Sequence, residues 1–210
     1  MKLIFATANK GKLREAREIL GEGYEISSSA DAGITEDIAE TGDTFTANSL
    51  IKAQYIWDRV GVDCFSDDSG LEVDALDGAP GVYSARYASL GTDDAADHDF
   101  DKNIERLLHE LNALEFKAMM DGTPAPERTA RFRCVVTLMI GGEPHFFEGS
   151  IEGKIAYERS GKGGFGYDPV FLPDVYPGRS MAELTEEEKN AVSHRGVALR
   201  KMAAWLAQNL

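Results

Sequence analysis

The sequence predicts a mixed α/β fold, in which a mixed twisted sheet is flanked by helices. Short apolar segments typical of strands are interleaved with segments of helical periodicity, and the two kinds do not alternate regularly. Residues 131–140 and 145–151 indicate an antiparallel hairpin closed around Gly141-Gly142-Glu143. Interleaved strands and helices, together with this hairpin, favour the mixed class.

The first half of the chain predicts strands and helices in turn. Residues 2–6 read as a short buried strand, and after the polar loop 7–12 the residues Leu13, Ala16 and Leu20 recur at helical spacing. The elements expected next are a strand and a loop rich in Ser and Asp within 24–40, a helix from Asp43 to Val60, a short strand at 63–66 that ends in Asp67-Asp68-Ser69-Gly70, an extended segment at 71–76, and a turn at 78–81.

The second half predicts a long helix, the hairpin and two final helices. Ile104, Leu107, Leu108 and Leu111 follow helical spacing, which predicts an amphipathic helix over about 98–114. The remaining elements expected are a flexible connection at 118–129, a glycine-rich stretch at 161–169 that leads into the apolar residues 170–172, a short helix opened by a capping box at 185–188, and a last helix that starts after Ser193 and runs through Leu206.

Charge and composition exclude several classes of protein. The 210 residues include 22 Lys and Arg against 36 Asp and Glu, a net charge of −14, so we expect no surface for a nucleic-acid polymer and no membrane partner. A hydrophobic fraction of 43% without repeats predicts one domain over 1–210 with no separable linker. No apolar run approaches the roughly 20 residues of a membrane span, and we expect no signal peptide. Cys64 and Cys134 lie in apolar, strand-like settings, which predicts buried thiols and a cytoplasmic location.

The loop at 7–12 joins a strand to a helix, a place where backbone N–H groups and the helix dipole bind phosphate. Asn9, Lys10 and Lys12 add donors and positive charge there. The loop is not a P-loop, because Ala6 stands where that pattern needs Gly and Leu13 where it needs Ser or Thr. An ordinary solvated helix start is the alternative interpretation.

Asp67 and Asp68 follow the strand at 63–66 directly, so we expect them at its C-terminal end, where α/β sheets place their sites. Two like charges this close favour a bound cation or a shared proton. Hard oxygen ligands favour Mg²⁺, which binds one or two carboxylates together with substrate phosphates. The alternative is an acidic turn in which an Asp caps the following Ser-Gly. Glu40 and Lys52, taken alone, read as solvated charges.

Two further segments could bind a ligand. Phe165 lies among glycines that allow close backbone approach, and its ring could stack on a planar base. Arg195 lies at the start of the last helix, and it is a donor-only side chain suited to carbonyl oxygens. The alternatives are a bend with buried aromatic residues and an ordinary N-cap at Ser193 followed by exposed residues.

The amino-acid sequences of these segments, and their order, resemble those of one family from residue 3 to about residue 200. The segments that carry the resemblance are T-A-N-K-G-K at 7–12, E-T-G-D-T-F at 40–45, D-D-S-G-L at 67–71, G-A-P-G-V-Y-S-A-R-Y at 78–87, G-G-F-G-Y-D-P at 163–169 and S-H-R-G at 193–196. Together they resemble the inosine/xanthosine triphosphate pyrophosphatase family.

The resemblance implies an elongated α/β fold with two lobes around a central cleft, and a homodimer. It also implies an enzyme that uses Mg²⁺ to hydrolyse non-standard purine nucleoside triphosphates (ITP, dITP and XTP). The products would be the nucleoside monophosphate and pyrophosphate, and the reaction would cleanse the nucleotide pool.

The resemblance further implies a role for each matching residue. Asp68, supported by Asp67, would activate water, and Glu40 with Asp68 would hold the metal. Phe165 would stack on the purine, with Lys189, His194 and Arg195 reading the base. The full set of substrate-binding residues implied is Thr7, Ala8, Asn9, Lys10, Gly11, Lys12, Lys52, Ser69, Phe165, Gly166, Tyr167, Asp168, Lys189, Ser193, His194 and Arg195.

Two other functions compete with this interpretation. A kinase or GTPase of the P-loop class is disfavoured by Ala6 and Leu13. A nucleotide-binding regulator without turnover is the alternative of a different kind, and it would be favoured if Glu40, Asp67 or Asp68 were replaced.

Overall fold

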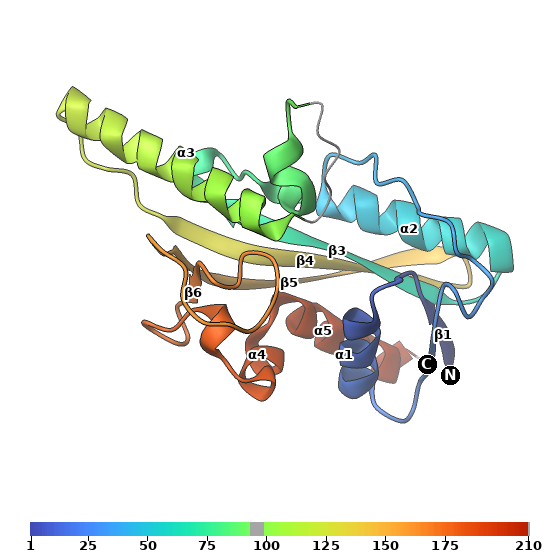
Figure 1. The fold of residues 1–210 in the computed structure, drawn as a ribbon. Helices are drawn as coiled ribbons and strands as arrows, with labels where there is room; N and C mark the ends of the chain where they lie inside the picture. Colours follow the sequence, from blue (N-terminus) through green and yellow to red (C-terminus); the bar gives the residue numbers. More distant parts are fainter. Residues whose placement is uncertain (93–98, 210) are drawn as a thin grey trace. The chain divides into compact units, whose positions relative to one another are not determined.

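The computed structural model of the chain describes residues 1–92 and 99–209 and has the mixed α/β architecture that the sequence predicts (Figure 1). Its strands form a six-stranded mixed sheet in the order β2-β1-β3-β4-β5-β6. The elements are β1 (Lys2–Phe5), α1 (Lys10–Leu20), β2 (Glu25–Ser28), α2 (Phe45–Val60), β3 (Cys64–Val73), α3 (Phe100–Asp121), β4 (Thr129–Ile140), β5 (Glu143–Ile155), β6 (Phe171–Pro173), α4 (Glu186–Val192) and α5 (His194–Asn209), with 3₁₀ helices at Asp74–Leu76, Gly81–Ser89 and Met181–Glu183.

The chain divides into two compact units. The first comprises Met1–Ser69, Arg133–Ser150 and Asn190–Leu210, and the second comprises Gly70–Phe132 and Ile151–Lys189. No helix in the described part of the chain combines the length and the hydropathy that a membrane span needs.

In the first unit a sheet is covered on both faces. β1 pairs in parallel with β2 and with β3. One face packs against α1 and α5, through a core that includes Phe5, Phe65 and Leu199. The other face packs against α2, whose Ala53 and Ile56 are fully buried (Figure 1). Because α1 and α2 lie on opposite faces, the chain reverses its winding between the carboxyl ends of β1 and β3, the place where open α/β sheets bind ligands.

In the second unit α3 packs against the 3₁₀ helix Gly81–Ser89. Asn103 fixes the contact: its side-chain amide donates to the carbonyls of Ser84 and Ala85, and its oxygen accepts from Ala88 N. β5 and β6 pair antiparallel. Hydrogen bonds from the buried Asn103 side chain to the backbone of the 3₁₀ helix therefore help to hold α3 against it.

Capping residues set where the helices begin and end. α2 begins at Phe45 rather than at the predicted Asp43, because the Thr44 hydroxyl accepts from Ala47 N and makes Thr44 the N-cap. α3 extends to Asp121, beyond the predicted end at 114, so the prediction of a flexible connection from 118 was wrong for residues 118–121. It ends at Gly122, which adopts the left-handed conformation. Residue 98, where this helix was predicted to begin, lies outside the described residues.

β3 differs most from the prediction. Instead of a strand that ends at Ser66, a single strand spans Cys64–Val73, so Asp67 and Asp68 lie inside it and not after it. The separate extended segment at 71–76 is half strand and half 3₁₀ helix. The predicted hairpin is confirmed: β4 and β5 are neighbours joined by Gly141 and Gly142, both with positive φ, as a type I′ hairpin turn requires. Buried free thiols at Cys64 and Cys134 are also confirmed.

Candidate active site

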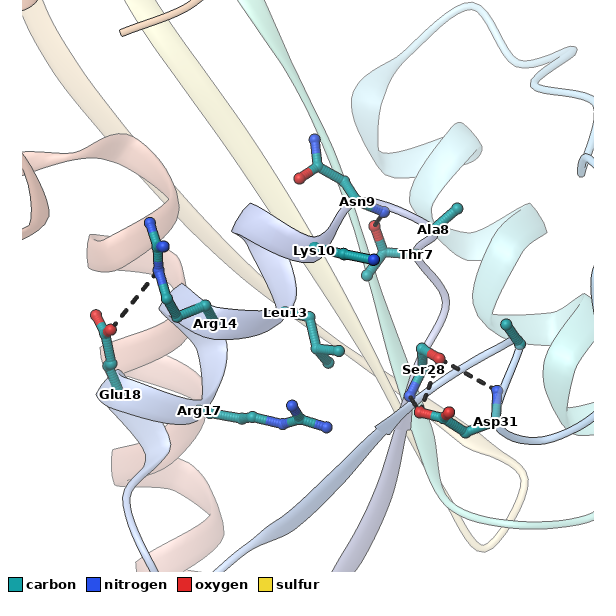
Figure 2. Close-up of a pocket in the computed structure, with 11 residues that line it drawn as sticks. Thr7, Ala8, Asn9, Lys10, Leu13, Arg14, Arg17, Glu18, Ser28 and Asp31 are labelled. Atoms are coloured by element: carbon teal, nitrogen blue, oxygen red, sulfur yellow. Dashed lines mark hydrogen bonds and ion pairs between the residues drawn. The ribbon is translucent and has the colours of Figure 1, made fainter. Parts of the chain in front are cut away.

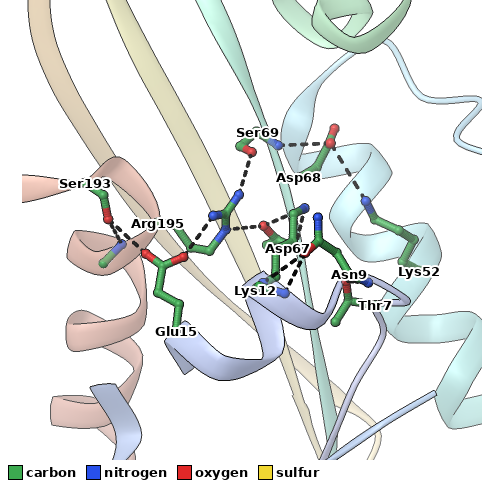
Figure 3. Close-up of polar contacts among 12 residues, drawn as sticks. Thr7, Asn9, Lys12, Glu15, Lys52, Asp67, Asp68, Ser69, Ser193 and Arg195 are labelled. Carbon is green, nitrogen blue, oxygen red and sulfur yellow. Dashed lines mark hydrogen bonds and ion pairs between the residues drawn. The ribbon is translucent and has the colours of Figure 1, made fainter. Parts of the chain in front are cut away.

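Asp67 is the centre of a buried charge network in the first unit. Its side chain is 1% exposed, and its two oxygens lie 3.0 Å from Lys12 Nζ. Arg195 Nε donates to Asp67 Oδ2 at 2.8 Å, and Arg195 Nη1 donates to Glu15 Oε2 at 2.9 Å (Figure 3). α1, β3 and α5 are therefore joined at one point by two carboxylates and two cations.

Asp68 belongs to a different group of side chains. Its Oδ1 lies 3.8 Å from Lys52 Nζ, and Lys52 also donates to Glu40 Oε1. The second oxygen, Oδ2, is buried and has no hydrogen-bond partner among the described residues. Successive side chains of a strand point to opposite faces of the sheet. Their adjacency in the sequence predicted a closely spaced pair of like charges, and this prediction was wrong. Each carboxylate instead faces its own cation (Figure 3).

The two carboxyl groups differ in acidity. Burial alone would raise the pKa of Asp67, but Lys12, Arg195 and Lys52 outweigh it and hold that pKa well below its usual range. Burial raises the pKa of Asp68 to about 6; Glu40 and Asp67 add to the effect and Lys52 opposes it. Asp67 is thus a permanent anion, whereas Asp68 can exchange a proton near neutral pH.

The loop before α1 is shaped by its own side chains. Asn9 Oδ1 accepts from Gly11 N at 2.8 Å and from Lys12 N at 3.2 Å, so Asn9 is the N-cap of α1. Thr7 Oγ1 accepts from Asn9 N. Lys12 faces Asp67, but Lys10 lines a separate pocket of about 680 Å³ on the β2 side of the helix. Thr7, Ala8 and Asn9 line the same pocket together with Leu13, Arg14, Arg17, Glu18, Ser28, Ala30 and Asp31 (Figure 2).

Three predicted residues lie where α5 begins. Ser193 Oγ donates to Glu15 Oε1 at 3.0 Å. It also accepts from Gly196 N, one of the backbone N–H groups in the first turn of α5. His194 is the first residue of α5 and is half-buried. Arg195 is 5% exposed, and its Nη2 makes only a 3.5 Å contact with Ser69 Oγ. Of the three guanidinium nitrogens, Nη2 is therefore the one with the most donor capacity left.

The remaining predicted residues form a second group, in the second unit. Asp168 Oδ2 accepts from Lys189 Nζ at 2.6 Å and from Phe165 N at 2.9 Å. Lys189 Nζ lies 4.9 Å from the centre of the Phe165 ring, which is 55% exposed. Tyr167 is buried and donates to Ser84 O, and Gly166 precedes it with a φ of +61°. This group offers an exposed aromatic face beside an ammonium group.

Gly164 fits only without a side chain, because a Cβ there would lie 2.2 Å from Asp168 Oδ2 and its φ is +76°. The short helix α4 places Lys189 with a capping box, since Glu188 N donates to Thr185 Oγ1 and Thr185 N donates to Glu188 Oε2. That capping box was predicted from the sequence and is confirmed.

The structure brings the predicted residues together as two sets, each within its own unit. Residues 7–12, Glu40, Lys52, 67–69 and 193–195 belong to the first unit, and 165–168 with Lys189 belong to the second. One member of the first set was missed by sequence reasoning. Glu15 of α1 binds Arg195 and Ser193, and no local signal marks it, because these partners are distant in sequence. Asn48 of α2 lies beside the Glu40 loop through its bond to Gly42, and sequence reasoning gave it no role.

Glu40 and Asp68 are the carboxylates suited to a divalent cation. Residues 1–92 and 99–209 contain no group of three His, Cys, Asp or Glu side chains that would make a complete protein site. Two carboxylates with an unsatisfied buried oxygen fit Mg²⁺, which binds one or two carboxylates and completes its octahedron with water and substrate phosphates. The donor set therefore fits a metal that arrives with a phosphorylated ligand.

The chain is similar to known proteins over nearly its whole length. The Ham1 family model matches residues 3–205. A dITP/XTP pyrophosphatase of Christiangramia forsetii is 44% identical over 208 residues, which cover 99% of this chain and 100% of that protein. Another of Porphyromonas gingivalis is 47% identical, covering 98% of this chain and 97% of that protein. The solved structure of a HAM1 protein from Coxiella burnetii superposes with a TM-score of 0.85 at 36% identity, covering 99% of each chain. The chain belongs to the Ham1 family.

Proposed function

We propose that this protein is a nucleoside-triphosphate pyrophosphatase that hydrolyses dITP, ITP and XTP to the nucleoside monophosphate and pyrophosphate. The observation that carries the proposal is the difference between two adjacent carboxylates. Asp67 is held as an anion by two cations. Asp68 lies near Lys52, and its Oδ2 has no hydrogen-bond partner among the described residues. The full-length relatives named dITP/XTP pyrophosphatase support the choice of substrate.

The triphosphate would be held by the first unit. Lys12 and Lys52 supply positive charge, and the N-terminus of α1 after Asn9 supplies backbone N–H groups. Thr7, Ala8, Lys10, Gly11 and Ser69 would complete this subsite. With a net charge of −14, the protein repels a polyanion at long range, so these local cations must attract it.

Glu40 and Asp68 would hold Mg²⁺ against the phosphates. When bound, the ion screens phosphate charge and lowers the pKa of a coordinated water. Because Asp68 has a pKa near 6 in the metal-free chain, its carboxylate is largely ionised at neutral pH and can accept the proton of an attacking water. Asp67 would support it with a fixed negative charge.

The reaction that follows from these roles is an in-line displacement at the α-phosphorus. The oxygen of water forms a bond to that phosphorus, its proton goes to Asp68, and the bond from the α-phosphorus to the bridging oxygen of pyrophosphate breaks. Lys12 and Lys52 would face the charge that develops on the leaving group and would stabilise it without a covalent intermediate.

The base would be selected by Phe165 and Lys189 of the second set and by His194 and Arg195 of the first. Phe165 offers an exposed ring for stacking, with Gly166, Tyr167 and Asp168 shaping the loop that carries it. Lys189, His194 and Nη2 of Arg195 would donate to the oxygen at position 6 of the purine. Adenine carries an amino group at that position and would leave such donors unpaired, which can reject an analogue by orders of magnitude.

Two further properties belong to the proposal. The buried free cysteines support a cytoplasmic location, because such thiols persist in a reducing compartment. The protein would form a homodimer, as the family resemblance implies. Light scattering on the purified protein would measure its mass and so test this.

The decisive experiment measures pyrophosphate release with Mg²⁺ from dITP, ITP, XTP, GTP and ATP at equal concentration. We expect rapid release from the first three and rates about a hundredfold lower for GTP and ATP. The donors at position 6 would disfavour adenine only, because guanine carries an oxygen there, so rejection of GTP would have to act on its 2-amino group. Excess EDTA should stop the reaction and added Mg²⁺ should restore it. Release of orthophosphate, or equal rates for all bases, would contradict the proposal, and binding without turnover would identify a regulator.

A further inference from the structure

Asn48 is a buried polar residue to which the proposed reaction assigns no role. It lies on α2, is fully buried, and its Oδ1 accepts from Gly42 N at 2.8 Å. Its Nδ2 is buried and has no hydrogen-bond partner in the described ranges. One half of this amide is therefore used to hold a loop, and the other half is unsatisfied.

The loop that Asn48 holds is the one that carries Glu40. Asn48 and Lys52 are four residues apart on α2 and so share a face of the helix. Lys52 donates to Glu40 itself and lies 3.8 Å from Asp68 Oδ1. The two helix residues thus connect the Glu40 loop to α2 at two points, and one of them also reaches β3.

Gly42 shows how closely the loop approaches the helix. A Cβ at this position would lie 2.6 Å from Ala47 Cβ and 2.8 Å from Asn48 Oδ1. Only glycine brings the backbone N–H within reach of the Asn48 oxygen without displacing α2. The Asn48–Gly42 hydrogen bond therefore sets the distance of the Glu40 loop from the helix.

The unsatisfied half of the amide has a complementary neighbour. Among residues 1–92 and 99–209, Asp68 Oδ2 is a buried acceptor without a partner and Asn48 Nδ2 is a buried donor without a partner. Asn48 lies one turn before Lys52 on α2, and Lys52 Nζ lies 3.8 Å from Asp68 Oδ1, so the amide is on the side of the helix that faces Asp68. Buried polar groups in native proteins are almost always paired, so an orphaned donor beside an orphaned acceptor indicates an arrangement that is completed when ligand binds.

We propose that Asn48 is a positioning residue for the reaction: its oxygen fixes the loop that carries Glu40, and its amide orients the Asp68 carboxylate, so that both carboxylates face one cation. This inference rests on the proposed function for its kinetic part only. Outer-shell partners of metal ligands typically change affinity by about 10- to 100-fold when removed, which gives the scale of the effect.

Two variants distinguish the role of the Asn48 oxygen, the acceptor, from the role of its NH₂ group, the donor. Asn48→Ala removes both, whereas Asn48→Asp keeps the acceptor for Gly42 N and loses the donor toward Asp68. Gln54→Ala is the matched control, because Gln54 is on the same helix and, among the described residues, its side chain bonds to Asp58 on the same helix. Folding is checked for each protein by circular dichroism, and Asn48→Asp serves if Asn48→Ala does not fold.

The measurements are the affinity for Mn²⁺ alone, by electron paramagnetic resonance, and kcat and KM with dITP. We expect Asn48→Ala to weaken Mn²⁺ binding about 10- to 100-fold, as removal of an outer-shell partner does, and to lower kcat more than it raises KM. Asn48→Asp should recover Mn²⁺ affinity but keep a low kcat. Wild-type Mn²⁺ affinity and kcat in Asn48→Ala would overturn the proposal, and full kcat in Asn48→Asp would overturn the part assigned to the amide. Failure of the proposed function would show instead as an inactive wild type.

Discussion

Asp67 and Asp68 are consecutive residues of β3, yet their carboxylates contact different cations. Asp67 lies 3.0 Å from Lys12 and 2.8 Å from Arg195, and Asp68 lies 3.8 Å from Lys52. The alternation of side chains along a strand separates two groups that the sequence places side by side. One carboxylate can therefore be structural and permanently ionised while its neighbour remains available for chemistry.

Replacement of Asp68 by Asn should abolish turnover without loss of stability. We expect kcat to fall by about 10²- to 10⁴-fold, the usual contribution of a general base. Stability at pH 7.5 should be equal or higher, because burial already disfavours the ionised form of this side chain. The measurements are pyrophosphate release from dITP and thermal unfolding. A kcat within threefold of the wild type would show that Asp68 is not the base.

Replacement of Asp67 by Asn should have the opposite effect on stability. Among the described residues, it would leave the buried Arg195 guanidinium with Glu15 as its one carboxylate partner, and it would remove the anion facing Lys12. Breaking a buried ion pair from one side typically costs about 3–5 kcal/mol. The free energy of unfolding in urea measures this, with Asp58→Asn, an exposed change on α2, as the control. Equal unfolding free energies for the two variants would contradict the structural role of Asp67.

The raised pKa of Asp68 predicts how stability depends on pH. A carboxyl group whose pKa is higher in the folded state stabilises the fold fully below its unfolded value of about 3.9. That contribution is lost as the pH rises through the folded value of about 6. In EDTA, the stability of the wild type relative to Asp68→Asn should therefore decrease between pH 4 and pH 6 and then level off. A constant difference across this range would place the Asp68 pKa near its ordinary value.

The fold was largely predictable because its signals are local. The spacing of Leu13, Ala16 and Leu20, the glycine pair at the hairpin and the capping box at Thr185 each specify an element from adjacent residues. The end of α3 was missed because the helical periodicity weakens after Leu111, and its last turns expose Met119 and Met120. The spacing of apolar residues cannot predict a helix in a segment where few side chains are buried.

The sequence predicts which residues could form the candidate site, but it does not predict how they contact one another. The D-D-S-G segment is typical of a turn, so the continuity of β3 through Asp67 and Asp68 could not be predicted from local propensity. β3 lies between β1 and β4 in the sheet, and Asp67 pairs with Arg195, which is 128 residues away. Glu15 was missed for the same reason, because its partners Ser193 and Arg195 are also distant in sequence. The role of each site residue, and a single domain over 1–210, stay predictions.

Phe165 provides the test of base recognition that is least confounded by folding. Its ring is 55% exposed, so its removal should change thermal stability little. Stacking of a base on an aromatic ring contributes about 1–3 kcal/mol, so Phe165→Ala should raise KM for dITP by roughly 5- to 150-fold while kcat changes less. Phe116→Ala is the matched control, because Phe116 is 61% exposed in the same unit and belongs to α3. Lys189, 4.9 Å from the ring centre, should retain its bond to Asp168 in the variant, so the effect can be assigned to the ring itself. An unchanged KM in Phe165→Ala, or an equal change in Phe116→Ala, would place the purine elsewhere.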